Sequence, residues 1–197
     1  MDKKGTQVML QKMDKEQVQN VYENHMKKDF PAEELKPLSA IFTMMERGIY
    51  DCLGFYEGGE LKAYAFFVMD LRWQVGLLDY LAVCEPYRGV GIGGKCLTEM
   101  KVYYKDKKGI LLECEKVEKA KDMEETRMRK RRIEFYVGNG CVETKVCSRL
   151  FGVEFTILYL PVREAKIEVF EELDRVYREM FPEPVYQKNV WVSASPF

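Results

Sequence analysis

The stretch from Leu77 to Thr98 constrains this chain more than any other, because it joins an apolar segment to a helix through a cluster of glycines. Leu77–Val83 is an apolar run long enough for one buried strand, and a helical pattern runs from Lys95 to Tyr104. Between them stand four glycines, Gly89, Gly91, Gly93 and Gly94. Glycines allow close approach of the backbone to a ligand, and the first amides of a helix have no partner within it. The stretch is therefore typical of a phosphate-binding loop.

Two well-known phosphate motifs fit this stretch poorly. Gly89-x-Gly91-x-x-Gly94 matches the dinucleotide fingerprint, with Glu113 near the position of its ribose-binding acid. That motif needs a tight turn directly after the strand, whereas residues 84–88 intervene here and Pro86 cannot donate to a sheet. A P-loop also matches through Gly94 and Lys95, but the following residue is a cysteine where a magnesium-binding hydroxyl is required.

The third pattern, Arg88-x-x-Gly91-x-Gly93, fits without adjustment, whereas a glycine-rich connection with no ligand is the plainer alternative. Residues 81–97, with the sequence LAVCEPYRGVGIGGKCL, resemble motif A of the GNAT superfamily of acyl-CoA N-acyltransferases. RRIEFYVGNGC, from Arg131 to Cys141, resembles motif B of that family, although Cys141 replaces its usual aromatic residue. The resemblance extends from about Tyr50 to Leu160.

The resemblance implies that acetyl-CoA is the cosubstrate. A backbone amide near the end of the central strand, at about Val83, would polarise the thioester oxygen, and the amides from Val90 to Gly94 would bind the pyrophosphate. The cofactor-binding residues expected on this basis are Leu81, Ala82, Val83, Arg88, Gly89, Val90, Gly91, Ile92, Gly93, Gly94 and Lys95. The basic cluster between Arg127 and Arg132 could also reach the CoA phosphates.

Three residues are candidates for proton transfer. Asp79 is the only acid within the apolar run, and a carboxylate there is costly unless it is paired or functional. It is the first choice for the general base, with a structural hydrogen bond as the alternative reading; Glu113 is second, and a water chain is third. Tyr136 occupies the tyrosine of motif B, which in that family commonly lies near the CoA sulfur, so the resemblance makes it the general acid. Without the resemblance, Tyr136 would be read as a packing residue.

Composition excludes several classes of protein. The net charge is -1 although 32% of the residues are charged, so no global field favours nucleic acid or an anionic membrane. The N-terminal residues MDKKGTQVML lack the apolar region of a signal peptide, and no apolar run approaches the length of a membrane span. The six cysteines form no CxxC pair, and the single histidine, His25, makes a metal site unexpected. We expect a cytoplasmic protein without a metal.

The order of elements predicts a mixed α/β fold. Strands flank the glycine signal of residues 57–60, and the central strand–helix–strand order implies a parallel pair. We expect a GNAT-like, mostly antiparallel mixed sheet with helices on both faces; the resemblance adds that its parallel central pair splays apart. Residues 1–161 would form the acetyltransferase domain. Residues 162–197 would add a helix and a tail that packs on the domain or on a second subunit, so a homodimer is open.

The expected function is transfer of an acetyl group from acetyl-CoA to a primary amine in a ternary complex. The acceptor could be a small molecule or a peptide. The resemblance places its pocket between the first two helices and the turn near Gly152, where Phe30, Phe42 and Tyr50 are candidate lining residues. The alternatives are a non-catalytic acyl-CoA-binding sensor or interaction module, and more remotely a nicotinamide-binding oxidoreductase.

Overall fold

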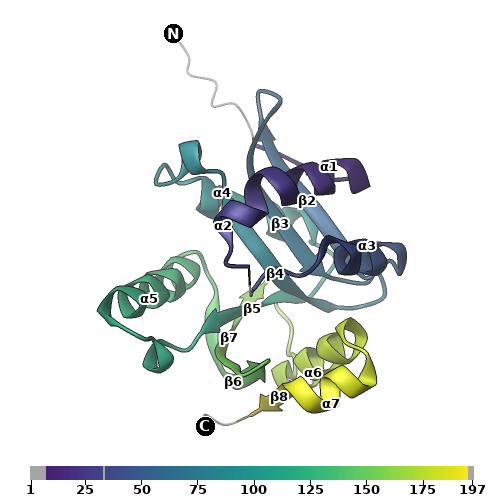
Figure 1. Cartoon of the computed structure of the whole chain (residues 1–197), viewed down its shortest axis with the longest axis vertical. Coiled ribbons are helices and arrows are strands. Elements are labelled where there is room, and N and C mark those ends of the chain that lie inside the picture. Colours follow the sequence, from purple (N-terminus) through teal and green to yellow (C-terminus); the bar gives the residue numbers. More distant parts are fainter. Residues whose placement is uncertain (1–7, 33, 195–197) are drawn as a thin grey trace. The chain divides into compact units, whose positions relative to one another are not determined.

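A computed structural model describes residues 8–32 and 34–194 of the chain (Figure 1). The chain forms two compact units. The first comprises residues 1–71 and 79–103, and the second comprises residues 72–78 and 104–197. Strand β4, Val75–Val83, contributes its first four residues to the second unit and the remainder to the first. The hydrogen-bonding order of the strands is β1-β2-β3-β4-β5-β7-β6-β8, so the chain has the mixed sheet that its sequence predicts.

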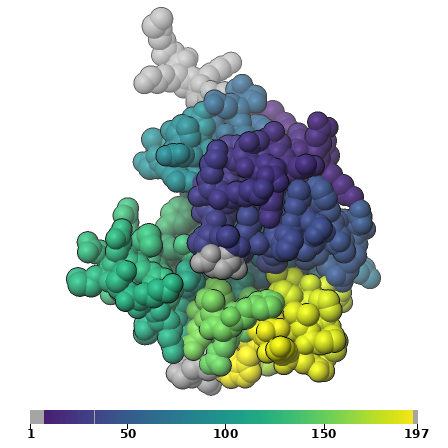
Figure 2. Space-filling view, in the orientation of Figure 1, coloured from purple at the N-terminus to yellow at the C-terminus, as the bar shows by residue number. Residues whose placement is uncertain are grey.

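The first unit contains three complete strands and two groups of helices. Its elements are β1 (Met9–Lys12), α1 (Lys15–Val21), a π-helical stretch (Tyr22–Met26), α2 (Lys27–Asp29), α3 (Leu38–Glu46), β2 (Tyr50–Glu57), β3 (Glu60–Val68) and α4 (Ile92–Tyr103). Within this unit α1, α2 and α3 lie on one face of β2 and β3, and α4 lies on the other (Figure 1). The space-filling view shows the side chains of the first helices covering their face of the unit (Figure 2).

Local signals explain several boundaries of the first unit. Asp14 and Gln17 form the predicted capping box at the start of α1. β2 and β3 pair antiparallel up to Glu57 and Glu60, and Gly58 and Gly59 adopt positive φ angles of 62° and 81°, as a tight hairpin requires. The expected strand from Thr6 to Leu10 overlaps β1 only in part, and residues 6 and 7 lie outside the described residues.

The predicted second helix, residues 33–47, is too long at its start. α3 begins at Leu38, and Pro37 caps it with an extended backbone. Proline disfavours the helical conformation of the residue before it, so Lys36 remains in the connection between α2 and α3. Residue 33 lies outside the described residues.

The second unit is built on β4, β5, β7, β6 and β8. Its elements are β5 (Gly109–Glu115), a 3-10 turn (Val117–Lys119), α5 (Met123–Gly138), β6 (Val142–Leu150), β7 (Val153–Pro161), α6 (Val169–Met180), α7 (Glu183–Asn189) and β8 (Val190–Ser193). The first residues of β4 pair parallel with β5, from Val75 opposite Gly109 to Leu78 opposite Leu112. The other pairings described in this unit are antiparallel.

The C-terminal residues form two elements that their sequence pattern does not predict. The predicted helix over residues 162–181 begins only at Val169, and the following residues form the short helix α7 and the strand β8. β8 pairs antiparallel with β6, with Val192 opposite Ser148. Residues 182–194 therefore pack on this chain's own second unit.

Candidate functional site

The glycine loop of the first unit leads from the end of β4 into α4. After Val83 the chain makes a 3-10 turn, Glu85–Tyr87, and α4 begins at Ile92. Gly89 and Gly91 have φ angles of 78° and 86°, a conformation that side chains with a Cβ rarely adopt. The order of strand, turn and helix is as predicted, but α4 begins three residues before the expected start at Lys95 and includes Gly93 and Gly94.

The loop is open to solvent and can accept an anion. A Cβ built on Gly89 or Gly91 meets no atom within 4 Å, and Val90 is 69% exposed. Gly93 and Gly94 lie in the first turn of α4, where amide groups have no acceptor within the helix, and Lys95 is exposed beside them. Backbone amides at a helix start, together with a lysine, suit a phosphate group.

The Arg88 side chain connects the loop to other parts of the first unit. Its Nε donates to the carbonyl oxygen of Val83 at 2.9 Å, and its Nη2 pairs with the Asp29 carboxylate. The Tyr64 hydroxyl donates to the same carboxylate at 2.7 Å, and the burial of Tyr64 beside Asp29 raises its pKa well above the usual value of a phenol. Arg88 thus fixes the end of β4 relative to the start of the loop.

Asp79 is buried and has two polar partners. Its side chain is 6% exposed, and its Oδ1 lies 2.7 Å from the Nζ of Lys36, in the connection before α3. Its Oδ2 accepts a hydrogen bond from the Tyr50 hydroxyl. Burial, and then the Asp79 charge, raise the pKa of Tyr50 well above its ordinary value, so Tyr50 remains a donor.

Glu113 lies in the second unit, on β5, in a network with the C-terminal helix. The hydroxyl of Tyr177 on α6 donates to Glu113 and lies 3.0 Å from the Ser148 hydroxyl on β6. Tyr177 and Ser148 are fully buried. Glu113 is therefore positioned by groups from two other elements of its unit.

Tyr136 also belongs to the second unit and lies near the end of α5. Its side chain is half-buried, and its ring contacts that of Phe135 with centroids 5.2 Å apart. Burial, followed by the nearby Cys114, raises the pKa of the phenol above its ordinary value. The hydroxyl therefore keeps its proton at neutral pH, as a proton donor must.

Solved structures share this arrangement of strands and helices. A protein assigned to the GNAT family of acetyltransferases from Bacteroides thetaiotaomicron superimposes with a TM-score of 0.69 and 16% identity, covering 87% of this chain and 95% of that one. The ribosomal-protein-S18-alanine N-acetyltransferase from Escherichia coli gives a TM-score of 0.58 and 16% identity, covering 81% and 96%. The chain has the GNAT fold.

A third structure with this fold was solved with ligands. Spermidine N-acetyltransferase from Vibrio cholerae, in complex with CoA and spermine, gives a TM-score of 0.56 and 9% identity, covering 80% of this chain and 96% of that chain. No family model and no curated protein sequence matches this chain.

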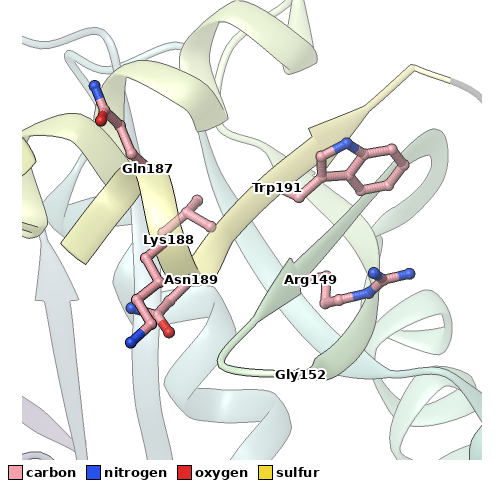
Figure 3. Close-up of a pocket in the computed structure, with 7 residues that line it drawn as sticks. Arg149, Gly152, Gln187, Lys188, Asn189 and Trp191 are labelled. Atoms are coloured by element: carbon pink, nitrogen blue, oxygen red, sulfur yellow. The ribbon is translucent and has the colours of Figure 1, made fainter. Parts of the chain in front are cut away.

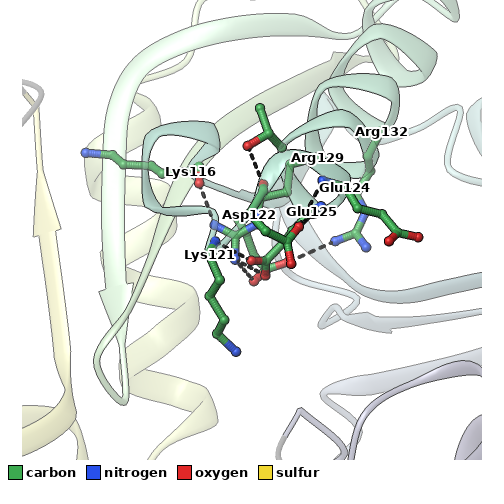
Figure 4. A network of polar contacts seen from close by, with 9 residues as sticks. Lys116, Lys121, Asp122, Glu124, Glu125, Arg129 and Arg132 are labelled. Atoms are coloured by element: carbon green, nitrogen blue, oxygen red, sulfur yellow. Dashed lines mark hydrogen bonds and ion pairs between the residues drawn. The ribbon is translucent and has the colours of Figure 1, made fainter.

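One arginine of the basic segment of α5, Arg129, is buried. The Arg129 side chain is 8% exposed and pairs with Glu115 at 2.7 Å and Glu125 at 2.8 Å (Figure 4). It also donates to the carbonyl oxygen of Lys116, while Asp122 caps the helix by accepting from two backbone amides. The Arg129 side chain is therefore already bonded to groups of the second unit.

A shallow pocket of about 390 Å³ opens in the second unit between the β6–β7 turn and the C-terminal elements (Figure 3). Its lining residues are Arg149, Gly152, Gln187, Lys188, Asn189, Val190 and Trp191. The Arg149 guanidinium lies 5.8 Å from the Trp191 ring centroid. None of the residues nominated for acetyl transfer lines this pocket.

Among residues 8–32 and 34–194, no helix is both long and apolar enough to cross a membrane. Within the same ranges, no three histidine, cysteine or acidic side chains are grouped as a metal site requires.

Lys36 and Tyr177 are two polar partners of the candidate acids that no sequence pattern indicated. Lys36 is 43 residues from Asp79, and Tyr177 is 64 residues from Glu113. Neither pairing has a local spacing pattern. The available signal was the isolated acid in the apolar run, which required a partner without identifying one.

Proposed function

We propose that this protein is an N-acetyltransferase that moves an acetyl group from acetyl-CoA to a primary amine by direct transfer. The observation that carries the proposal is the exposed loop at the end of β4, where Gly89 and Gly91 adopt positive φ angles before α4 begins. The GNAT fold around the loop agrees with it.

The loop and the end of β4 would hold acetyl-CoA. Backbone amides from Val90 to Gly94 would bind the pyrophosphate, with Lys95 beside them. Leu81, Ala82 and Val83 are half-buried at the end of the strand. An amide there, at about Val83, would polarise the thioester carbonyl and stabilise the negative charge that develops on its oxygen.

Proton transfer is assigned to three side chains. Asp79 would be the general base that receives the proton of the attacking amine, and Glu113 is the second candidate for that role. Tyr136 would be the general acid that protonates the departing CoA thiolate. The raised pKa of Tyr136 supports this role, because the donor must be protonated when the bond breaks.

The acceptor is proposed to be an amine from a small molecule or a peptide. Two proteins with this fold are named for such acceptors, a spermidine acetyltransferase and a ribosomal-protein alanine acetyltransferase. Direct transfer is preferred to an acyl-cysteine relay through Cys84, because burial raises the pKa of that thiol and disfavours the thiolate. We place the reaction in the cytoplasm.

The second candidate function is an acyl-CoA-binding sensor or interaction module without catalysis. A thiol-release assay with acetyl-CoA and a panel of primary amines separates the two, after mass spectrometry has identified any co-purified CoA. We expect amine-dependent release of free CoA together with acetylated amine. Tight binding of acetyl-CoA without release for any amine would favour the sensor.

A further inference from the structure

The Asp79 carboxylate belongs to a dry, aromatic-lined cluster in the first unit. Tyr50, Tyr80 and Phe66 are 2%, 5% and 0% exposed. The Phe66 ring lies 6.1 Å from that of Tyr50 and 6.4 Å from that of Tyr80. Phe30 also contacts Tyr80, with ring centroids 5.0 Å apart.

This cluster has the chemistry of a site for a primary ammonium group. A carboxylate supplies the opposite charge, and the face of an aromatic ring attracts a cation, more strongly where water is excluded. The Nζ of Lys36 uses both features, because it lies 2.7 Å from the Oδ1 of Asp79 and 5.2 Å from the Tyr80 ring centroid. The cluster therefore already holds an alkylammonium, which the chain itself supplies.

The Lys36 side chain can move away from this site more readily than Asp79 can. Its side chain is 22% exposed and comes from the connection between α2 and α3, whereas Asp79 is fixed on a strand. Two tyrosine hydroxyls hold the backbone of the connection, since the Lys36 amide donates to the Tyr80 hydroxyl at 2.9 Å and the Tyr22 hydroxyl donates to the Lys36 carbonyl oxygen at 3.0 Å. The four-carbon side chain can thus turn outward while its backbone stays in place.

Exchange of one ammonium for another keeps the buried charge balanced. A carboxylate left without a cation in this environment is strongly disfavoured, but an incoming alkylammonium would replace the charge that Lys36 removes. An acceptor with its own carboxylate next to the amine would be repelled by Asp79. The site therefore favours amines without an acid beside the amino group, and the unbranched side chain of Lys36, which already occupies it, indicates a linear aliphatic chain.

We propose that Lys36 is an internal stand-in for the acceptor: the Asp79, Tyr50 and Tyr80 site takes the ammonium of a linear aliphatic primary amine, which displaces the Lys36 ammonium. This inference rests on the proposed function, whose acceptor class it names. It also makes Lys36 a competitor of the substrate, since the site is open only when Lys36 has turned away.

The first test follows Lys36 in the wild-type protein without acetyl-CoA. The ¹⁵N resonance of the Lys36 ammonium, assigned with Lys36→Arg, is recorded while n-butylamine is added, and n-butanol serves as the neutral control. We expect the resonance to shift or to exchange faster with water on addition of the amine only. A Lys36 resonance that stays unchanged at saturating amine overturns the inference.

The second test measures the affinity for n-butylamine by calorimetry in Lys36→Met and in a matched control. If Lys36 occupies the site about nine-tenths of the time, its removal should tighten binding about tenfold. Lys15→Met removes one lysine charge from an exposed ion pair with Glu46 and should bind like the wild type. A folded Lys36→Met protein that binds the amine no more tightly than the wild type contradicts the competition.

The two levels of the proposal can fail separately. Displacement of Lys36 by the amine without release of thiol from acetyl-CoA would keep the ammonium site and overturn the transferase. Thiol release with linear amines while the Lys36 resonance does not change would keep the transferase and overturn the stand-in.

Discussion

Replacement of Arg88 by glutamine tests whether the contacts of the Arg88 side chain fix the glycine loop to the end of β4. Glutamine removes the charge and shortens the side chain, so both the bond to the Val83 carbonyl and the pair with Asp29 are lost. Asp29 is only 10% exposed and keeps the Tyr64 hydroxyl as a donor. The variant therefore leaves a nearly buried carboxylate with one fewer partner.

The magnitude follows from the exposure of the two partners. A hydrogen bond to a charged group contributes about 1.5–3 kcal/mol when it is buried. The Arg88 side chain is 51% exposed, so water replaces part of what it loses, and exposed ion pairs contribute only about 0.2–1 kcal/mol. The mixed environment puts the expected loss for Arg88→Gln at about 1–2 kcal/mol.

A double-mutant cycle measures the contact itself. Stability to urea is compared for the wild type, Arg88→Gln, Asp29→Asn and the double variant, and we expect a coupling of about 1 kcal/mol. Arg88→Lys retains the charge but not the planar donor geometry, so it should recover only part of the loss. A coupling below about 0.3 kcal/mol, which is the scatter of independent sites, would show that the Arg88–Asp29 pair does not stabilise the protein.

Three further variants test the proposed site. Tyr136→Phe should lower kcat roughly 10–10²-fold, the low end for a general acid because a thiolate leaves readily, with acetyl-CoA binding unchanged. Since burial raises the Tyr136 pKa, its phenol stays protonated as pH rises, and the wild-type rate should show no decline from this group below about pH 10; a decline near neutral pH removes Tyr136 as the acid. Asp79→Asn should abolish the rise of rate with pH, and an unchanged profile would transfer the role to Glu113 or to water. Tyr177→Phe should cost about 1–3 kcal/mol in urea unfolding, because Glu113 and the buried Ser148 lose a partner, and an unchanged midpoint would show that the network contributes nothing.

Local signals predicted the fold wherever the residues that decide an element are close in sequence. The Asp14 capping box and the Gly58-Gly59 hairpin are examples, because each depends on four neighbouring residues. The parallel pairing of β4 and β5 also followed from the chain order. The predicted start of α3 is wrong because the apolar spacing continues back past Pro37, and a proline disfavours the helical conformation of the residue before it.

Long-range partners and the C-terminal elements could not be derived in this way. β8 exists because Val190–Ser193 pairs with β6, and four residues without that neighbour carry no clear strand pattern. The same distinction between local and long-range signals applies to the candidate site. The glycine loop was predicted from adjacent residues, whereas the partner of Asp79 comes from the separate connection that contains Lys36.

Binding of acetyl-CoA to the glycine loop is measured most directly by calorimetry on the wild type and three valine variants. The wild type should bind in the range typical of enzyme substrates, about 1 μM–1 mM. Gly91→Val and Gly93→Val should lose binding, because a side chain prevents close approach of the backbone. Gly59→Val is the matched control, since Gly59 in the hairpin has a φ of 81° against 86° for Gly91, and a Cβ at either meets no atom within 4 Å.

The control separates backbone strain from loss of the ligand site. Gly59→Val and Gly91→Val should lose similar stability, about 1–2 kcal/mol for a non-glycine residue in the left-handed region, but only Gly59→Val should retain the wild-type affinity. Wild-type affinity for acetyl-CoA in both Gly91→Val and Gly93→Val would contradict the assignment of the loop.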